Sequence, residues 1–285
     1  MDFTIDTATP AVEQSFAATP DPRLREIMQM LTRYLHDFVR EAAPSIAEWN
    51  AAIGFLTEVG QWCSDTRQEF ILLSDVLGVS MLVETLNGHE GGTEGTVLGP
   101  FHMTGSPKRS LGDSIDLLGG SRLCVVSGTV LGVGGEPLAG ATVDVWQCTE
   151  DGFYDVQQPD VQPAGNGRGL FRTDEQGRFW FRTVVPCHYP IPTDGPVGQL
   201  LDATHRHPFR PAHVHFLASA DGHEDVTTHA FVAGGAHIDS DAVFAVKKGL
   251  LVDFAESTDA ELAARFGVEA PFVHARFDIV LTKRA

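Results

Sequence analysis

Two histidines separated by one residue are the side chains in this chain best placed to hold a metal ion. His213 and His215 lie in the run Arg210-Pro-Ala-His-Val-His-Phe. On a β-strand, residues two apart point to the same face, so both imidazoles would project side by side. The spacing suits two neighbouring ligands of one metal, and equally two hydrogen-bonded histidines on a half-exposed strand. A second such pair, His205 and His207, comes just before a proline and is expected in a loop, where we do not expect it to bind metal.

Two of the three tyrosines lie in segments typical of loops. Tyr154 is preceded by Asp-Gly-Phe, and Tyr189 is followed by Pro-Ile-Pro. Loops at the end of a rigid scaffold often display functional groups, so phenols there are candidates for chemistry. Each phenol would also suit a partly buried aromatic side chain whose hydroxyl is hydrogen-bonded.

The elements that must position these residues change character near Gly95. Before it, apolar residues recur every three or four positions from Leu24 to Val39, which predicts an amphipathic helix. Ser45 and Glu48 form a capping-box pattern before a second helix. After Gly95, β-branched runs separated by Gly, Pro and Asp predict short strands. We expect strands at Leu123 to Leu131, Ala141 to Gln147, Gly169 to Thr173, Arg178 to Val184, Ala212 to Ala218, Thr227 to Val232 and Ala275 to Leu281.

This pattern predicts a mostly β protein with two regions. Residues 1–95 would form an N-terminal α-helical region that serves dimerisation, and residues 96–285 an antiparallel β-sandwich that carries the catalytic site. The helical stripe would either join two subunits or pack on its own sandwich.

Composition excludes some classes of partner. A formal charge of -18 argues against binding to nucleic-acid phosphates, which needs clustered Lys and Arg. We find no signal peptide and no apolar run long enough to span a membrane, so a cytoplasmic location is expected. The four cysteines show no C-x-x-C pair, which fits buried thiols in a reducing compartment.

Six motifs resemble those of the intradiol ring-cleaving dioxygenases, in the same order over nearly the whole chain. They are Leu98-Gly-Pro-Phe-His, Gly135-Glu-Pro-Leu-Ala-Gly-Ala through Asp144-Val-Trp-Gln, Asp151-Gly-Phe-Tyr-Asp-Val-Gln, Phe171-Arg-Thr-Asp, Tyr189-Pro-Ile-Pro-Thr-Asp-Gly-Pro-Val-Gly and Arg210-Pro-Ala-His-Val-His-Phe. Two further segments, Phe70-Ile-Leu-Leu-Ser-Asp-Val-Leu-Gly and His237-Ile-Asp-Ser-Asp-Ala-Val-Phe, resemble members that cleave hydroxyquinol. One such motif alone would be weak, whereas six in order are specific.

The resemblance implies one ferric ion per subunit, held by Tyr154, Tyr189, His213 and His215. Phenolates are hard anionic donors that suit Fe(III). Tyr189 matches the tyrosinate that leaves the metal and accepts a proton from the substrate, and Arg210 matches the cation that stabilises developing negative charge. The implied reaction cleaves a small aromatic diol or triol with O2 between adjacent hydroxyls. For hydroxyquinol the product is 3-hydroxy-cis,cis-muconate, or maleylacetate, in the catabolism of aromatic compounds.

The resemblance also implies a substrate pocket. Its walls would be Leu72, Asp75, Val97, Gly99, Pro100, Phe101, Ile191, Pro192, Arg210, His229 and Val243. Asp75 would accept a hydrogen bond from the third ring hydroxyl, although it would also suit a helix cap. His229 departs from the family, because catechol-cleaving members carry Gln there, and it would also suit a structural strand residue.

Partners and rival functions complete these expectations. By resemblance we expect a homodimer joined through the N-terminal helices, with a phospholipid bound at the interface. Within the family the rival is a catechol or chlorocatechol 1,2-dioxygenase. Outside it, Gly135-Glu-Pro-Leu-Ala-Gly-Ala-Thr-Val also resembles prealbumin-like binding modules, and His213 and His215 with a carboxylate would suit a zinc hydrolase. Convergence of the two phenols and two imidazoles would separate the enzyme from a binding module, metal analysis would separate it from a zinc hydrolase, and oxygen uptake with each substrate would separate the rivals within the family.

Overall fold

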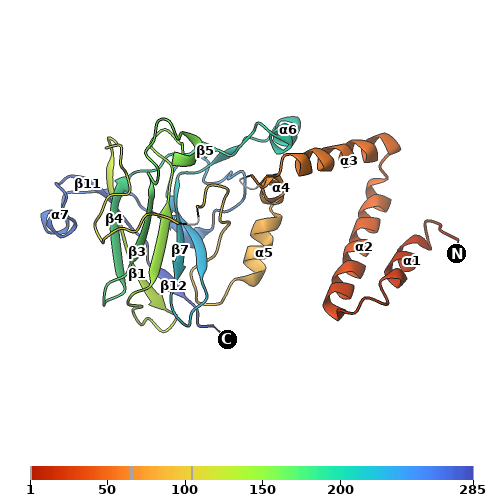
Figure 1. The fold of residues 1–285 in the computed structure, drawn as a ribbon, viewed down its shortest axis with the longest axis horizontal. Helices are drawn as coiled ribbons and strands as arrows, with labels where there is room; N and C mark the ends of the chain where they lie inside the picture. The colour runs from red at the N-terminus through yellow and green to blue at the C-terminus, as the bar shows by residue number, and fades with distance from the viewer. Residues whose placement is uncertain (1, 65–66, 104, 285) are drawn as a thin grey trace. The chain divides into compact units, whose positions relative to one another are not determined.

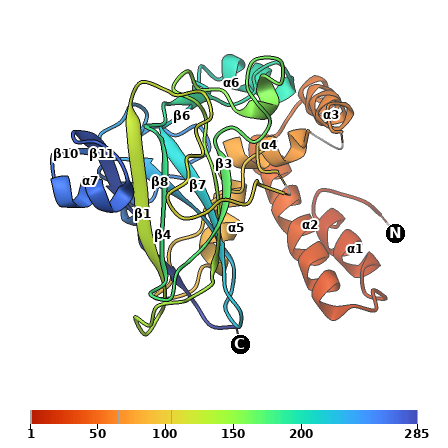
Figure 2. The same cartoon turned by 60° about the vertical axis from the view of Figure 1, so that its left-hand side comes forward.

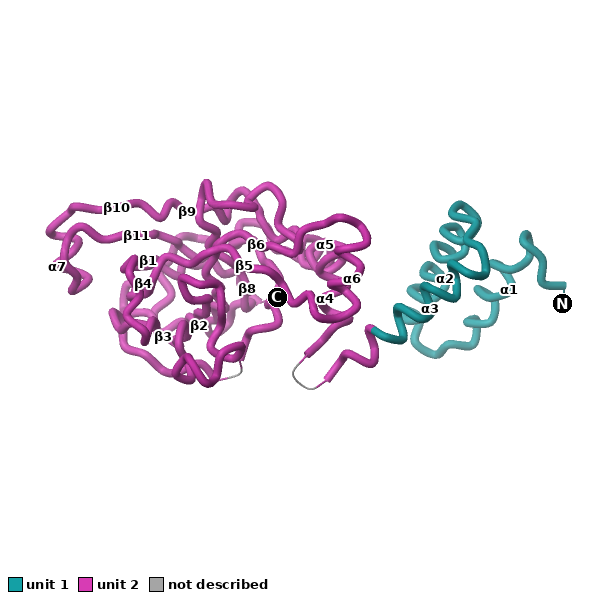
Figure 3. The backbone as a smooth tube through the Cα atoms, turned by 90° about the horizontal axis from the view of Figure 1, so that it is seen from above, with its two compact units in different colours: residues 1–58 teal, residues 59–285 magenta. Residues whose placement is uncertain are grey.

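The chain divides into two compact units. The computed structural model describes residues 2–64, 67–103 and 105–284, and Figure 1 labels their helices and strands. Contacts along the chain separate residues 1–58 from residues 59–285, coloured differently in Figure 3.

Residues 1–58 are helical, as the periodicity predicts. They comprise α1 (Ala8–Ser15), α2 (Pro22–Ala42) and most of α3 (Ile46–Gln61), with α1 beside α2 in Figure 2. The expected capping box at the start of α3 is confirmed, because Ser45 Oγ accepts from the Glu48 N–H at 3.2 Å and Glu48 Oε2 accepts from the Ser45 N–H at 2.7 Å. These bonds satisfy N–H groups that have no partner inside the helix.

The second unit begins with the end of α3 and then two short helices, α4 (Glu69–Val76) and α5 (Val79–Asn87), before the first strand. Two sheets follow. One has the order β10 (Ala255–Ser257), β11 (Phe272–Arg276), β1 (Leu123–Gly132), β12 (Ile279–Leu281), with β4 (Arg178–Val184) also paired to β1. The other has the order β3 (Arg168–Arg172), β2 (Thr142–Trp146), β7 (His213–Ser219), β8 (Val226–Val232), β9 (Leu251–Val252).

Aromatic rings fill the space between the two sheets. Phe179 and Phe181 of β4 lie 6.0 and 6.4 Å, between ring centroids, from Phe216 of β7 in the other sheet. All three side chains are buried. Burial of rings of this size contributes most of the hydrophobic stabilisation of such a core. The sandwich expected from the sequence is therefore present.

The sheets are mixed rather than purely antiparallel, which corrects the prediction. β1 runs parallel to both β11 and β12, and β8 runs parallel to β9. Parallel neighbours need long connections, and more than 130 residues separate β1 from β11. Alternating apolar residues reveal a strand but not its direction. The single strand expected at Ala275 to Leu281 is in fact two, β11 and β12.

Shorter elements complete the second unit. The two-stranded ribbon of β5 (Tyr189–Pro190) and β6 (Phe209–Arg210) flanks α6 (Pro196–Ala203), and η1 (Asp155–Gln157), η2 (Lys248–Leu250) and α7 (Ala260–Phe266) lie in connections. All four cysteines are free, but Cys63 and Cys187 are only partly buried, which corrects the expectation of four core thiols. Among the described residues, no helix is both long and apolar enough to cross a membrane.

Candidate metal centre

The two phenols and two imidazoles singled out in the sequence meet at one point. Tyr154 Oη lies 3.1 Å from Tyr189 Oη, which lies 3.2 Å from His213 Nε2, and His213 Nε2 lies 3.1 Å from His215 Nε2. All four side chains are at most 2% exposed. The fold thus brings together four donor atoms from residues up to 61 positions apart, each within 3.2 Å of the next.

Local structure explains how each donor is aimed. His213 and His215 are two apart on β7 and so project from one face of the sheet. Tyr189 of β5 is paired with Arg210 of β6, which brings the arginine alongside the phenol. Tyr154 precedes η1, and its backbone N–H donates to Gln157 Oε1 at 2.9 Å, which holds that loop in place.

The spacing of these four atoms fits a metal ion. Metal–nitrogen and metal–oxygen bonds of about 2.0–2.1 Å at angles near 90–110° place neighbouring donor atoms about 2.9–3.4 Å apart. The observed separations of 3.1 to 3.2 Å fall inside that range. In addition, His213 Nδ1 lies 2.7 Å from the Pro211 carbonyl, so its proton belongs on Nδ1 and leaves Nε2 free to bind a cation. These residues could therefore hold a metal.

Burial sets the protonation of the donors. It lowers the pKa of His213 and His215 well below 6.5, with nearby Arg210 lowering both further, so both imidazoles are neutral. Burial also raises the pKa of Tyr154 well above 10 and that of Tyr189 to about 12. Neutral imidazoles can bind a cation directly, whereas each phenol must first lose a proton.

Arg210 is a buried cation beside the four donors. Its Nη1 lies 3.3 Å from His213 Nε2, and its Nε and Nη2 lie 3.3 and 3.5 Å from the two carboxylate oxygens of Asp241. Burial acts to lower the pKa of Arg210, but the charges of Asp241 and Tyr189 outweigh it and raise the pKa. Asp241 is held in turn by the N–H groups of Val243 and Ala245. Asp241 is a site residue that sequence reasoning missed, although it lies in a motif quoted above.

A cavity of about 370 Å³ reaches Gly99, the residue that packs against the His215 ring, although none of the four donors lines it. Three of the expected wall residues, Asp75, Val97 and Gly99, line it. Gly99 has φ +78°, and a Cβ there would lie 3.2 Å from His215 Cε1, so the chain passes the ring at close range. Gly99 therefore lies between the cavity and the imidazole. Both its positive φ and its short distance to the ring favour glycine here.

Asp75 lines this cavity and has a buried carboxylate oxygen without a protein partner. Its side chain is 3% exposed, and Oδ1 has no hydrogen-bond partner. Burial raises its pKa, against smaller opposite effects of Ser80 and Arg210. The alternative of a helix cap does not hold, because α5 begins after Gly78 and no side chain caps it. A buried acceptor without a protein partner calls for an explanation, which a bound ligand would provide.

The remaining residues expected in the pocket wall differ in their packing and burial. Phe101 stacks on Tyr154 with ring centroids 4.6 Å apart and meets Tyr189 edge-on at 6.4 Å, so it packs against both phenols. Leu72, Ile191 and Val243 are buried, Pro192 is half-buried and Pro100 is exposed.

A third imidazole, that of His229, joins the histidine pair. Ring centroids of His229 lie 4.1 Å from His215 and 4.7 Å from His213. Among the residues described, the one cluster of His, Cys, Asp or Glu with metal-binding spacing is these three histidines, without a carboxylate. The zinc hydrolase with two histidines and a carboxylate therefore lacks its third ligand in the part of the chain described. A pure binding module has no need for such convergence.

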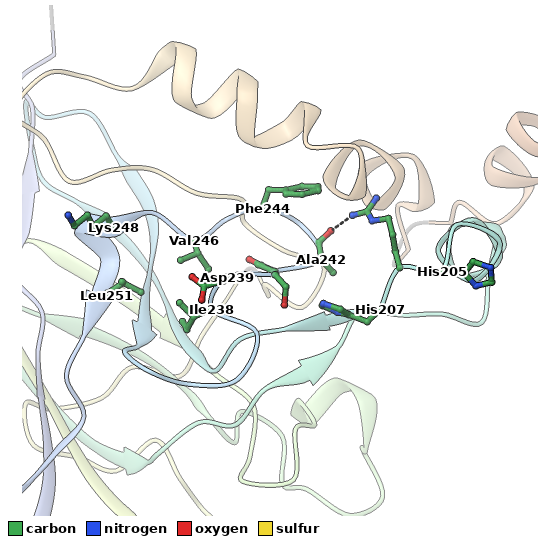
Figure 4. Close-up of a pocket in the computed structure, with 12 residues that line it drawn as sticks. His205, His207, Ile238, Asp239, Ala242, Phe244, Val246, Lys248 and Leu251 are labelled. Atoms are coloured by element: carbon green, nitrogen blue, oxygen red, sulfur yellow. Dashed lines mark hydrogen bonds between the residues drawn. The ribbon is translucent and has the colours of Figure 1, made fainter. Parts of the chain in front are cut away.

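A larger cavity is also present in the second unit. It has a volume of about 760 Å³, and its lining includes His205, His207, Asp239 and Asp241 but none of the four donors. Figure 4 shows His205 and His207 lying apart from one another, as expected for loop residues. His207 Nδ1 accepts from the Phe209 N–H at 3.1 Å, so it has a structural partner. We assign no chemistry to this cavity.

Comparison with known proteins connects this geometry to a family. A family model described as "Dioxygenase" matches residues 103–283, and one described as "Catechol dioxygenase N terminus" matches residues 21–94. Hydroxyquinol 1,2-dioxygenase of Rhizobium sp. is 53% identical over 249 residues, which cover 87% of this chain and 84% of that protein. 6-chlorohydroxyquinol 1,2-dioxygenase of Cupriavidus pinatubonensis is 51% identical, over 88% and 91% of the two chains. The structure of hydroxyquinol 1,2-dioxygenase from Pseudomonas putida matches with a TM-score of 0.91 at 44% identity, covering 98% of this chain and 99% of that one.

Proposed function

This chain belongs to the intradiol ring-cleavage dioxygenases, and from that premise we propose that it opens the ring of hydroxyquinol, benzene-1,2,4-triol, with O2 between the adjacent hydroxyls. The product would be 3-hydroxy-cis,cis-muconate, or its tautomer maleylacetate, in aromatic catabolism. The observation that carries the proposal is that four donor atoms converge, and that a cavity lined by Asp75 reaches Gly99 next to the His215 ring. Relatives named for hydroxyquinol cleavage support the substrate.

We propose that the metal is one ferric ion per subunit, held by Tyr154, Tyr189, His213 and His215. The family implies a metal, and the choice of Fe(III) rests on the donors, because two hard anionic phenolates favour that state. When bound, such an ion would act as a Lewis acid that favours deprotonation of the substrate hydroxyls, and it would make the deprotonated substrate reactive toward O2.

The protein side chains provide the rest of the proposed mechanism. Tyr189 is placed to accept a substrate proton at Oη, and in the metal-free site burial raises the pKa of its phenol to about 12. Arg210, buried and held by Asp241, places a fixed positive charge beside the reacting ring. Burial of all four donors keeps bulk water from the site, which strengthens these interactions.

Asp75 is proposed to recognise the third hydroxyl of hydroxyquinol. Catechol lacks that hydroxyl and would leave the buried carboxyl unpaired, so it should react less well. We expect Asp75→Ala to reduce the preference for hydroxyquinol over catechol, as the ratio of kcat/KM values, by about 10- to 100-fold. Asp75→Asn keeps an acceptor oxygen and should retain part of the preference.

Asp225→Ala is the matched control for this prediction. Asp225 lines the same cavity but is paired with Arg284 at 3.4 Å and is half exposed. Its removal should leave the preference unchanged. An unaltered preference in Asp75→Ala, or an equal loss in both alanine variants, would rule out Asp75 as the recognition group.

The overall function can be tested directly on aerobically purified protein. We expect about one iron per chain, a visible phenolate-to-iron absorption band, and rapid oxygen uptake with hydroxyquinol. Catechol, a chlorocatechol and 6-chlorohydroxyquinol serve as the comparison substrates. Faster uptake with catechol or a chlorocatechol would favour that alternative within the family. A colourless zinc protein without oxygen uptake would refute the proposal.

We further propose that two copies associate through α2. Inside residues 1–58, α1 lies along the polar side of α2, where Arg33 Nε bonds Glu13 Oε1 at 3.0 Å and His36 Nδ1 lies 3.0 Å from Thr9 Oγ1. The apolar stripe is left open, with Leu35 53% and Phe38 63% exposed. Contiguous apolar surface of this kind usually marks an interface, and a second copy of α2 presents the same surface.

Leu35→Glu should therefore weaken the dimer. Because a charge would replace buried apolar surface, we expect the dissociation constant, measured by analytical ultracentrifugation, to rise at least about 100-fold. Val133→Glu is the control, since Val133 is an exposed apolar residue in a turn of the sandwich. A monomeric wild type, or a dimer whose dissociation constant does not change in Leu35→Glu, would contradict the proposal.

We also propose that a phospholipid binds at this interface, which lipid extraction would test. A cytoplasmic location is proposed as well, and it rests on the unpaired cysteines.

A further inference from the structure

One ring nitrogen of a proposed metal ligand has no partner. His213 Nδ1 is satisfied by the Pro211 carbonyl at 2.7 Å, but His215 Nδ1 is buried without any hydrogen bond in the described structure. If His215 binds a cation through Nε2, its ring proton must sit on Nδ1. Metal-binding histidines almost always donate that N–H to an acceptor, which fixes the ring and increases its basicity.

The rings around His215 leave one acceptor. Trp146, stacked on His215 at 4.6 Å, offers only an N–H donor. Tyr154 Oη and His213 Nε2 belong to the row of donor atoms at the metal centre. The fourth neighbour, His229, has its ring centroid 4.1 Å away, and neither of its nitrogens has a partner. A neutral imidazole always keeps one acceptor nitrogen.

The sheet holds the two rings against each other. Trp146, His215 and His229 are directly opposite one another on β2, β7 and β8, so their side chains share one face of three adjacent strands. His229 is 0% exposed, and a wholly buried polar side chain with no partner calls for an explanation. The two rings are not directly hydrogen-bonded in this structure, so a bond between them needs a bridging water or a small rotation of the rings.

We propose that His229 is a positioning residue for the metal centre, accepting a hydrogen bond from His215 Nδ1–H, directly or through one water, and so fixing the tautomer that presents Nε2. This inference rests on the proposed function, since it requires His215 to be a metal ligand. It changes the expected role of His229 from a wall of the substrate pocket to a support behind a ligand.

The test measures iron binding rather than turnover. Apo-protein is titrated with ferric iron in competition with nitrilotriacetate, and binding is followed by the phenolate-to-iron band. We expect His229→Leu, which cannot accept a hydrogen bond, to weaken iron binding by about 10- to 100-fold. His229→Gln, which carries an acceptor oxygen, should restore affinity to within about threefold of wild type.

Stability of the apo-protein separates this role from simple packing. His229→Leu removes a buried unpaired group, so its apo melting temperature should equal or exceed that of the wild type. Phe179→Leu is the packing control, because Phe179 of β4 is buried between the two sheets, lies 6.0 Å from Phe216 between ring centroids and has no polar atom. It should lower stability and leave iron affinity unchanged.

Each outcome has a distinct meaning. Equal iron affinity in wild type and His229→Leu would overturn the positioning role. Equal losses in His229→Leu and His229→Gln would overturn it too, and would indicate instead that the imidazole itself is a ligand. A wild type that gains no phenolate-to-iron band would refute the proposed function rather than this inference alone.

Discussion

Tyr154→Phe is expected to yield a protein that loses most of its iron, its visible band and its ring-cleaving activity. The substitution removes one oxygen from the row of donors, the one 3.1 Å from Tyr189 Oη. Lewis-acid assistance is worth several kcal/mol, and each 1.4 kcal/mol is a factor of ten, so kcat should fall by at least about a thousandfold. Iron content, absorption and oxygen uptake of the variant are the measurements.

Proton release gives this prediction a second readout. At neutral pH both phenols of the apo site are protonated, because burial raises the pKa of Tyr154 well above 10 and that of Tyr189 to about 12. Each must lose its proton when a metal binds, so iron affinity should rise with pH below those values. In a weakly buffered titration, Tyr154→Phe should release one proton fewer per metal bound than wild type.

Tyr34→Phe is the matched control. Tyr34 is the third tyrosine, lies on α2 and is 67% exposed. Its variant should match wild type in colour, iron content, activity and proton release. A Tyr154→Phe protein that kept its colour and turnover would show that this phenol is not a metal ligand.

Asp241→Asn should lower both stability and activity, because it leaves the buried Arg210 guanidinium without a counter-charge. The side chains of Arg210 and Asp241 are 3% and 2% exposed and contact each other through both carboxylate oxygens. Removing one partner of such a pair costs about 3–5 kcal/mol in the free energy of unfolding. Without Asp241 the Arg210 guanidinium would also no longer be held in its orientation at the site, which should reduce kcat by about 100-fold. Chemical denaturation and steady-state kinetics test the two effects.

Arg210→Lys tests the catalytic role of Arg210 without removing its buried positive charge. It keeps the positive charge and loses the forked geometry that matches a carboxylate, so we expect kcat to fall about 100-fold or more with little loss of iron. Asp37→Asn is the control, because Asp37 pairs with Arg40 on the exposed surface of α2, where an ion pair contributes little. Unchanged kcat in both Asp241→Asn and Arg210→Lys would remove Arg210 from the mechanism.

Patterns along the chain predicted the helices and the sandwich well, because each arises from local spacing. The stripe from Leu24 to Val39 lies on α2, and the box of Ser45 and Glu48 begins α3. Strand direction was not predictable in this way. The parallel pairing of β1 with β11 and β12 depends on where a long connection returns, which no local period records.

The sequence by itself showed His-x-His on an expected strand and two phenols in turn-like segments as candidates for chemistry, and the family resemblance joined them into one expected metal site. Only the tertiary structure decided that Tyr154 and Tyr189 reach the histidines. It also decided that Asp241 holds Arg210, and that His229 lies opposite His215 on the neighbouring strand. The physical reason is range. A residue's type and its strand periodicity are local, whereas hydrogen bonds, ion pairs and pKa shifts arise between residues that folding brings together from distant parts of the chain.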